Sequence, residues 1–128
     1  MTNNYELKFT FKKYERISKQ KEIETVLKNG EKIFSRGVIF YLYKNQANKF
    51  SRLAVLVSSK VEKLAVVRNK FKRRIREIFR LNKHKILYPV DIIVIATKDS
   101  IRLKYKVLEE IFLNILKEKN LIKNEFLY

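Results

Sequence analysis

Apolar residues recur at helical spacing in three stretches of the chain, and these stretches predict three helices. The first follows Ser18, a residue type that caps helices, and ends at Asn29-Gly30, a typical helix stop. Its apolar positions, spaced by three and four residues, are Ile23, Val26 and Leu27. The second helix covers residues 65–81, and the third begins near Asp99 or Ser100, either of which can cap it.

Runs of β-branched and aromatic residues predict a small sheet. The run at residues 36–43 alternates, so its side chains divide between two faces, with Ile39, Tyr41 and Tyr43 on one and Val38, Phe40 and Leu42 on the other. Residues 52–58 follow after a polar turn, which predicts an antiparallel hairpin between these two strands. Residues 90–96 are the most apolar run and predict a central strand buried on both sides.

A further short strand is expected at Ile33 and Phe34, so the element order is helix, strands, helix, strand, helix. This order predicts an α+β single domain, a two-layer sandwich in which helices cover a small sheet. We expect the domain to span residues 17–119, after a basic N-terminal arm (residues 1–16) and before a C-terminal tail (residues 120–128).

Charge is distributed very unevenly along the chain, and this distribution indicates a function as well as a fold. The chain has 30 Lys and Arg residues against 13 Asp and Glu, a formal net charge of +17. Six of the nine residues from Arg68 to Arg76 are basic. On a helix, an arc of about 140° beside an apolar arc of about 120° holds Arg68, Asn69, Lys72, Arg73, Arg76 and Arg80, and the remaining side holds Lys70, Arg74 and Glu77. Solvated helices usually mix both signs of charge, so this face predicts binding to a polyanion, above all nucleic acid.

The run from Arg68 to Glu77, RNKFKRRIRE, resembles the RNR-x-KR-x-x-RE signature of the bacterial ribonuclease P protein subunit. Lys70 stands where that family usually has its second Arg, which keeps the charge and weakens a two-pronged contact. The resemblance extends from about Ile17 to Lys119. It implies an αβββαβα fold like that of ribosomal protein S5 domain 2, with a left-handed βαβ crossover where general rules favour the right-handed one.

The resemblance also implies a function. The family's protein is a cofactor of a catalytic RNA subunit that, with bound Mg²⁺, removes the 5′ leader from precursor tRNA. RNA subunit contacts carry over to Lys60, Arg68, Asn69, Lys70, Lys72, Arg73 and Arg76. Leader contacts, in a cleft between the first helix and the sheet, carry over to Ile23, Leu27, Ile39 and Tyr41. Of these four only Tyr41 is aromatic; Ile23 and Leu27 replace frequent Phe residues and leave aliphatic packing without stacking.

The residues themselves offer little protein catalysis. The single histidine, His84, lies among lysines at a helix end, where a contact with the helix dipole is its expected role. Glu109 and Glu110 are adjacent and point to different helix faces, and neither Asp91 nor Asp99 has a carboxylate partner at motif spacing. No phosphate-binding glycine loop or zinc spacing occurs. We therefore expect no catalytic side chain and no protein metal site.

Three alternatives remain at this stage. A ribosomal or other structural RNA-binding protein would carry the same charge. A DNA-binding regulator would present Asn, Gln or Ser for base edges, whereas this face is almost wholly Arg and Lys. A membrane-surface helix would have to place its apolar arc in the lipid, but the sheet needs the same arc as its cover. The chain has no cysteine, signal-peptide core or spanning apolar run, so we expect a cytoplasmic protein with RNA partners and neither a membrane nor a DNA partner.

Overall fold

The computed structural model describes residues 9–123, which form one α+β domain with the element order αβββαβα. The main elements are α1 (Gln20–Asn29), β1 (Glu31–Ser35), β2 (Val38–Lys44), β3 (Arg52–Leu56), α2 (Ala65–Asn82), β4 (Val90–Ala96) and α3 (Tyr105–Glu118). Two short 3₁₀ turns, η1 (Lys13–Glu15) and η2 (Lys83–Lys85), precede α1 and follow α2. The predicted order of elements is confirmed, including the short strand at Ile33 and Phe34.

The four strands form one mixed sheet in the order β1-β2-β4-β3. Strand β4 lies in the interior, antiparallel to β2 and parallel to β3. The predicted hairpin between β2 and β3 is therefore wrong, although the prediction of a central β4 is confirmed. Because β4 is apolar on both sides, its insertion between β2 and β3 buries more apolar surface than direct pairing of those two strands would.

A true hairpin joins β1 and β2 instead. Its two-residue turn, Arg36-Gly37, has positive φ at both positions, 50° and 88°, as the tight turns that match strand twist require. Gly30, at the end of α1, is required for a different reason, namely close packing against neighbouring backbone. A Cβ there would lie 2.5 Å from the carbonyl oxygen of Val26, so only glycine fits between α1 and β2.

Two predicted helix caps are wrong. Helix α1 begins at Gln20 with Lys19 at the N-cap, because the preceding backbone is extended along β3, where the Ile17 N–H donates to the Leu53 carbonyl at 3.0 Å. Helix α3 begins only at Tyr105. Ser100 is buried and closes the turn before it, accepting a hydrogen bond from the Thr97 N–H at 3.0 Å.

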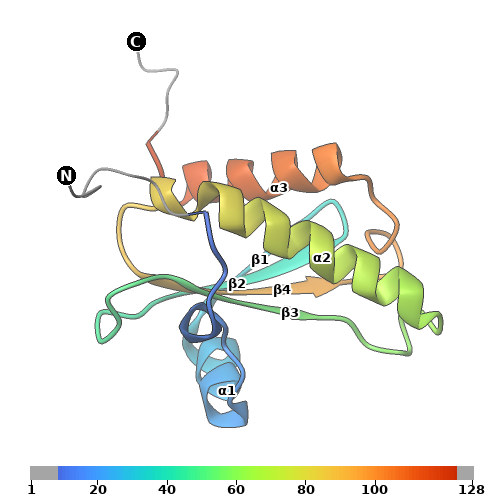
Figure 1. Ribbon diagram of the computed structural model, residues 1–128, viewed down its shortest axis with the longest axis horizontal. Helices are drawn as coiled ribbons and strands as arrows, with labels where there is room; N and C mark the ends of the chain where they lie inside the picture. Colours follow the sequence, from blue (N-terminus) through green and yellow to red (C-terminus); the bar gives the residue numbers. More distant parts are fainter. Residues whose placement is uncertain (1–8, 124–128) are drawn as a thin grey trace.

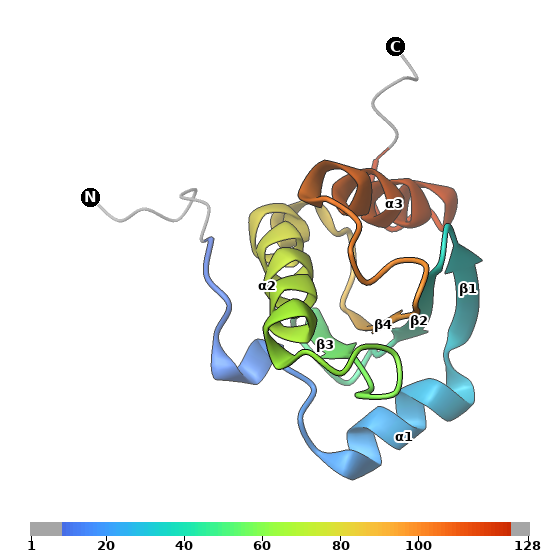
Figure 2. The same cartoon turned by 90° about the vertical axis from the view of Figure 1, so that its right-hand side faces the viewer.

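Helices α2 and α3 cover one face of the sheet and α1 lies on the other (Figures 1 and 2). The main core lies beneath α2 and α3 and includes Phe40, Phe71, Phe79, Ile92 and Phe112, each at most 2% exposed. This core extends past residue 119, since Leu121 and Ile122 are also buried in it. The N-terminal arm contributes as well, because Phe11 packs edge-on against Phe79.

Candidate nucleic-acid interface

The basic arc of α2 faces away from the core. Four apolar residues that face the core are completely buried, namely Phe71, Ile75, Ile78 and Phe79, and Val67 packs against the core partly buried. Asn69, Lys70, Arg73 and Arg76, which turn away from it, are exposed, and Lys72 is half-buried. None of these five side chains forms a hydrogen bond or ion pair with another residue between 9 and 123. The positive charge of this face is therefore available to an external anion.

Arg68 plays a different part from its neighbours. Its Nη1 donates to the carbonyl oxygens of Glu62 at 2.8 Å and Lys63 at 2.9 Å. The guanidinium thus holds the connection at residues 58–64 against the start of α2. Lys60 is exposed within that connection. The structure therefore brings the seven residues implied for RNA subunit contact to the first two-thirds of α2 and the connection before it.

The remaining arginines of α2 serve the fold. Arg74 donates to the Leu103 carbonyl at 2.8 Å, and Arg80 donates to the Phe9 carbonyl at 2.7 Å. Arg80 also pairs with Glu77 at 2.6 Å, and this hydrogen bond lowers the pKa of Glu77. Burial, together with the nearby charge of Arg16, lowers the pKa of Arg76. The guanidinium-rich stretch is thus divided between anchoring contacts and a free outer face.

A second surface lies where α1 crosses the other face of the sheet. Three of the residues implied for leader contact are partly buried and belong to one apolar cluster: Ile23 and Leu27 of α1 and Tyr41 of β2. Ile39 is also partly buried and lies two residues before Tyr41 on the same face of β2, outside this cluster. The structure therefore brings together Ile23, Leu27 and Tyr41, and it places Ile39 on the same face of β2. Sequence reasoning missed other partly exposed members from three strands: Tyr43, Leu56 and Ile95. The apolar character of β4 on both sides was the signal that could have indicated Ile95.

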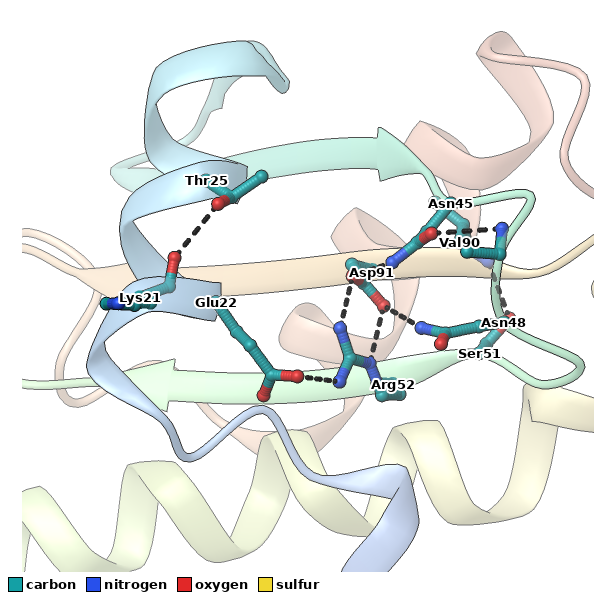
Figure 3. A network of polar contacts seen from close by, with 10 residues as sticks. Lys21, Glu22, Thr25, Asn45, Asn48, Ser51, Arg52, Val90 and Asp91 are labelled. Atoms are coloured by element: carbon teal, nitrogen blue, oxygen red, sulfur yellow. Dashed lines mark hydrogen bonds and ion pairs between the residues drawn. The ribbon is translucent and has the colours of Figure 1, made fainter.

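A polar network lies at one end of this surface (Figure 3). Asp91 on β4 is 1% exposed and accepts hydrogen bonds from Arg52 Nε at 3.0 Å and Nη2 at 2.8 Å. Arg52 Nη1 donates to Glu22 of α1 at 2.9 Å, and the Asn45 and Asn48 side chains donate to Asp91 at 3.1 and 3.5 Å. These acids raise the pKa of Arg52, so the guanidinium stays charged.

The network fixes α1 across the sheet, because it joins residues of α1, β3, β4 and the β2–β3 loop. A cavity of about 240 Å³ lies beside it, lined by Thr25 and Tyr43 as well as by the network. Sequence reasoning found no carboxylate partner for Asp91 because its partner is an arginine from another strand. No local motif carries that signal.

Other candidate chemistry is scattered. Within residues 9–123, no three His, Cys, Asp or Glu side chains gather in a group that could hold a metal ion. His84 is exposed in η2, with its ring edge-on to Phe9 at 5.4 Å. No helix of this part of the chain is long and apolar enough to cross a bilayer.

Comparisons with known proteins agree with this geometry. The family model for ribonuclease P matches residues 11–120. The ribonuclease P protein component of Alkaliphilus oremlandii is 34% identical over 109 residues, which cover 85% of this chain and 94% of that protein. The component of Streptococcus pneumoniae is 37% identical over 106 residues, covering 83% and 85% of the two chains.

Solved structures show the same relationship. The ribonuclease P protein of Staphylococcus aureus superposes with a TM-score of 0.76 at 31% identity, covering 85% of this chain and 98% of that one. The protein of Thermotoga maritima gives a TM-score of 0.71 at 32% identity, covering 86% and 99%. The chain therefore belongs to the ribonuclease P protein family and is a subunit of ribonuclease P, an endoribonuclease that processes tRNA.

Proposed function

We propose that the outer face of α2 binds the catalytic RNA subunit. The observation that carries this proposal is the set of exposed α2 side chains without a partner among residues 9–123, with Asn69, Lys70, Arg73 and Arg76 at its centre. Phosphate groups fit such a face, because each guanidinium can donate two parallel hydrogen bonds to one phosphate. Lys60 and Lys72 extend the face at its margins, and Arg68 positions Lys60 while adding charge.

The cleft between α1 and the sheet is the proposed site for the single-stranded 5′ leader of precursor tRNA. Its floor is apolar and partly exposed, which suits the faces of unpaired bases. Tyr41 is its stacking residue, and Ile23 and Leu27, which pack in the same cluster, provide aliphatic contacts. Ile39, on the same face of β2 as Tyr41, would extend these contacts along the strand. Stacking contributes about 1–3 kcal/mol for each base engaged. This contact would raise the affinity of the holoenzyme for its substrate.

Cleavage itself is assigned to the RNA subunit and its Mg²⁺. The exposed face of α2 is strongly cationic, so it repels a divalent cation and favours the RNA as the main metal ligand. The protein would assist by neutralising phosphates and holding the leader. The family resemblance also supports a left-handed β3–α2–β4 crossover, which we propose for this chain.

Reconstitution tests the proposal. Purified protein and the catalytic RNA of the same organism are mixed at low Mg²⁺, and release of the leader from a precursor tRNA is followed. Release that requires both components is the expected result. Cleavage by the protein alone would contradict the assignment of chemistry to the RNA. Binding without cleavage in any mixture would favour a purely structural RNA-binding role.

A further inference from the structure

A cavity of about 570 Å³ lies outside both surfaces described above. Three segments far apart in the sequence line it: the N-terminal arm, the end of the β2–β3 loop, and the connection from η2 to β4. Its exposed side chains are Leu87 together with three aromatic and three basic residues, namely Tyr14, Phe50, Tyr88, Lys12, Lys49 and His84. Neither the family signature nor the leader cleft includes any of them.

We call this cavity the aromatic pocket. Its three aromatic side chains do not belong to the core. Tyr14 is 58% exposed, Phe50 38% and Tyr88 45%, whereas the core aromatics are at most 2% exposed. Tyr14 and Phe50 face each other with ring centroids 4.6 Å apart at 61°. Exposed rings that converge on one cavity provide a stacking surface for a flat ligand.

The charge of the pocket selects an anionic ligand. Glu15 is its single acidic lining residue, and it is neutralised by an ion pair with Lys83 and a hydrogen bond from the Lys12 N–H at 2.7 Å. Lys12, Lys49 and His84 remain exposed, and Lys44 lies 5.1 Å from the ring of Tyr88. Aromatic rings beside unneutralised cations are the combination that binds single-stranded nucleic acid.

The position of the pocket indicates which nucleic acid this is. The β2–β3 loop separates it from the leader cleft: Asn45 and Asn48 line the cavity at the end of the cleft, and Lys49 and Phe50 line the pocket. This loop lies at the start of β3, whereas α2 begins beyond the other end of β3, so the two lie at opposite ends of the strand (Figure 1). A strand that runs along the cleft away from the start of α2 therefore reaches the pocket next.

We propose that the aromatic pocket binds an unpaired nucleotide of the precursor tRNA leader, upstream of the nucleotides that occupy the cleft. The proposal rests on the proposed function, because it needs the leader to lie in the cleft. Tyr14 and Phe50 would stack on the base, and Lys12 and Lys49 would face its phosphates. The site would extend recognition toward the 5′ end and make affinity depend on leader length.

The test compares reconstituted holoenzymes on precursor tRNAs whose leaders are shortened stepwise from the 5′ end. The variant Tyr14→Ala/Phe50→Ala removes the stacking pair without opening the core, because both side chains are exposed. The matched control is Phe34→Ala, an aromatic residue 64% exposed on the far edge strand β1. With the longest leader the double variant should bind at least about fivefold more weakly than wild type, and with the shortest it should bind equally well. The control should match wild type throughout.

Three outcomes would overturn the proposal. An unchanged affinity at every leader length would show that the pocket binds no leader nucleotide. An equal loss at every length would place the effect elsewhere on the substrate. Weaker binding of the RNA subunit alone would make that RNA the occupant. A parallel Tyr41→Ala variant separates this from the proposed function: if it leaves leader affinity unchanged, the cleft assignment fails, whatever the double variant does.

Discussion

The two faces of the sheet are completed differently, although the same strands supply both. Beneath α2 and α3, Phe40 and Ile92 lie in a closed core and are at most 2% exposed. On the opposite face their immediate neighbours, Tyr41 and Ile93, lie beneath α1, and Tyr41 stays partly exposed. Alternate residues of one strand thus lie in the closed core on one side and on the proposed leader-binding surface on the other. A single short helix leaves apolar side chains on this face of the sheet partly exposed.

The difference extends to what holds each helix in place. Helix α2 is held by apolar packing over its middle and later turns, because four of its residues between Phe71 and Phe79 are fully buried. Helix α1 has one buried residue, Val26, and depends in addition on the ion pair of Glu22 with Arg52. We call the face beneath α2 and α3 the closed face and the face beneath α1 the open face. Loss of buried side-chain volume should therefore lower the free energy of unfolding most on the closed face, and loss of a charged partner should lower it most on the open face. The predictions below test that contrast.

The largest effect is expected on the closed face. Replacing Phe79 with Ala removes a completely buried ring that packs against Phe11, and should lower the free energy of unfolding by about 3–5 kcal/mol. Urea unfolding followed by circular dichroism measures this. A loss below about 1 kcal/mol would show that α2 is not held by this core.

The corresponding change on the open face is Arg52→Ala. It leaves the buried Asp91 without its main partner, so we expect a loss of about 3 kcal/mol. The matched control is Arg102→Ala, because Arg102 pairs with Glu62 while 64% exposed and should cost less than about 1 kcal/mol. Equal losses of unfolding free energy in the two variants would show that the network does not anchor α1.

Tyr41→Ala separates function from stability on the open face. Because Tyr41 is only partly buried, its loss should cost no more than about 1.5 kcal/mol in urea unfolding. Affinity for a precursor tRNA with a leader should fall by about 1–3 kcal/mol, and affinity for mature tRNA should not change. An equal fall with both RNAs would show that Tyr41 does not contact the leader.

The smallest effect is expected from Glu77→Gln, which breaks the exposed counterpart of the Arg52 pair. The hydrogen bond from Arg80 lowers the pKa of Glu77 below its ordinary 4.5, so the contact stabilises the fold above that pH. The variant should be slightly less stable at pH 7, and the difference should vanish as the pH falls through the lowered pKa. Urea unfolding at pH 7 and pH 3 measures this. A difference that did not shrink between pH 7 and pH 3 would contradict the ion-pair origin.

The same contrast explains what the sequence could predict. The outer face of α2 was predictable because its residues are contiguous and helical periodicity alone sorts them. The pairing of β3 was not predictable, because the short polar loop after β2 favours a hairpin between β2 and β3. The true partner of β3 is β4, and the paired residues Arg52 and Asp91 are 39 positions apart in the sequence. The network could not be found either, since Glu22 and Arg52 are 30 residues apart. Family resemblance, not periodicity, indicated the cleft residues.

The division of labour between the two surfaces is tested most directly by measuring two variants against two RNAs. Arg73→Ala should weaken binding to the RNA subunit and reduce the slope of log affinity against log salt by about one. Lys106→Ala, an exposed cation on α3, serves as its control. Tyr41→Ala should leave that slope unchanged and weaken only binding that depends on the leader. If Arg73→Ala left the salt slope unchanged, or both variants weakened both interactions equally, the assignment of two separate surfaces would be contradicted.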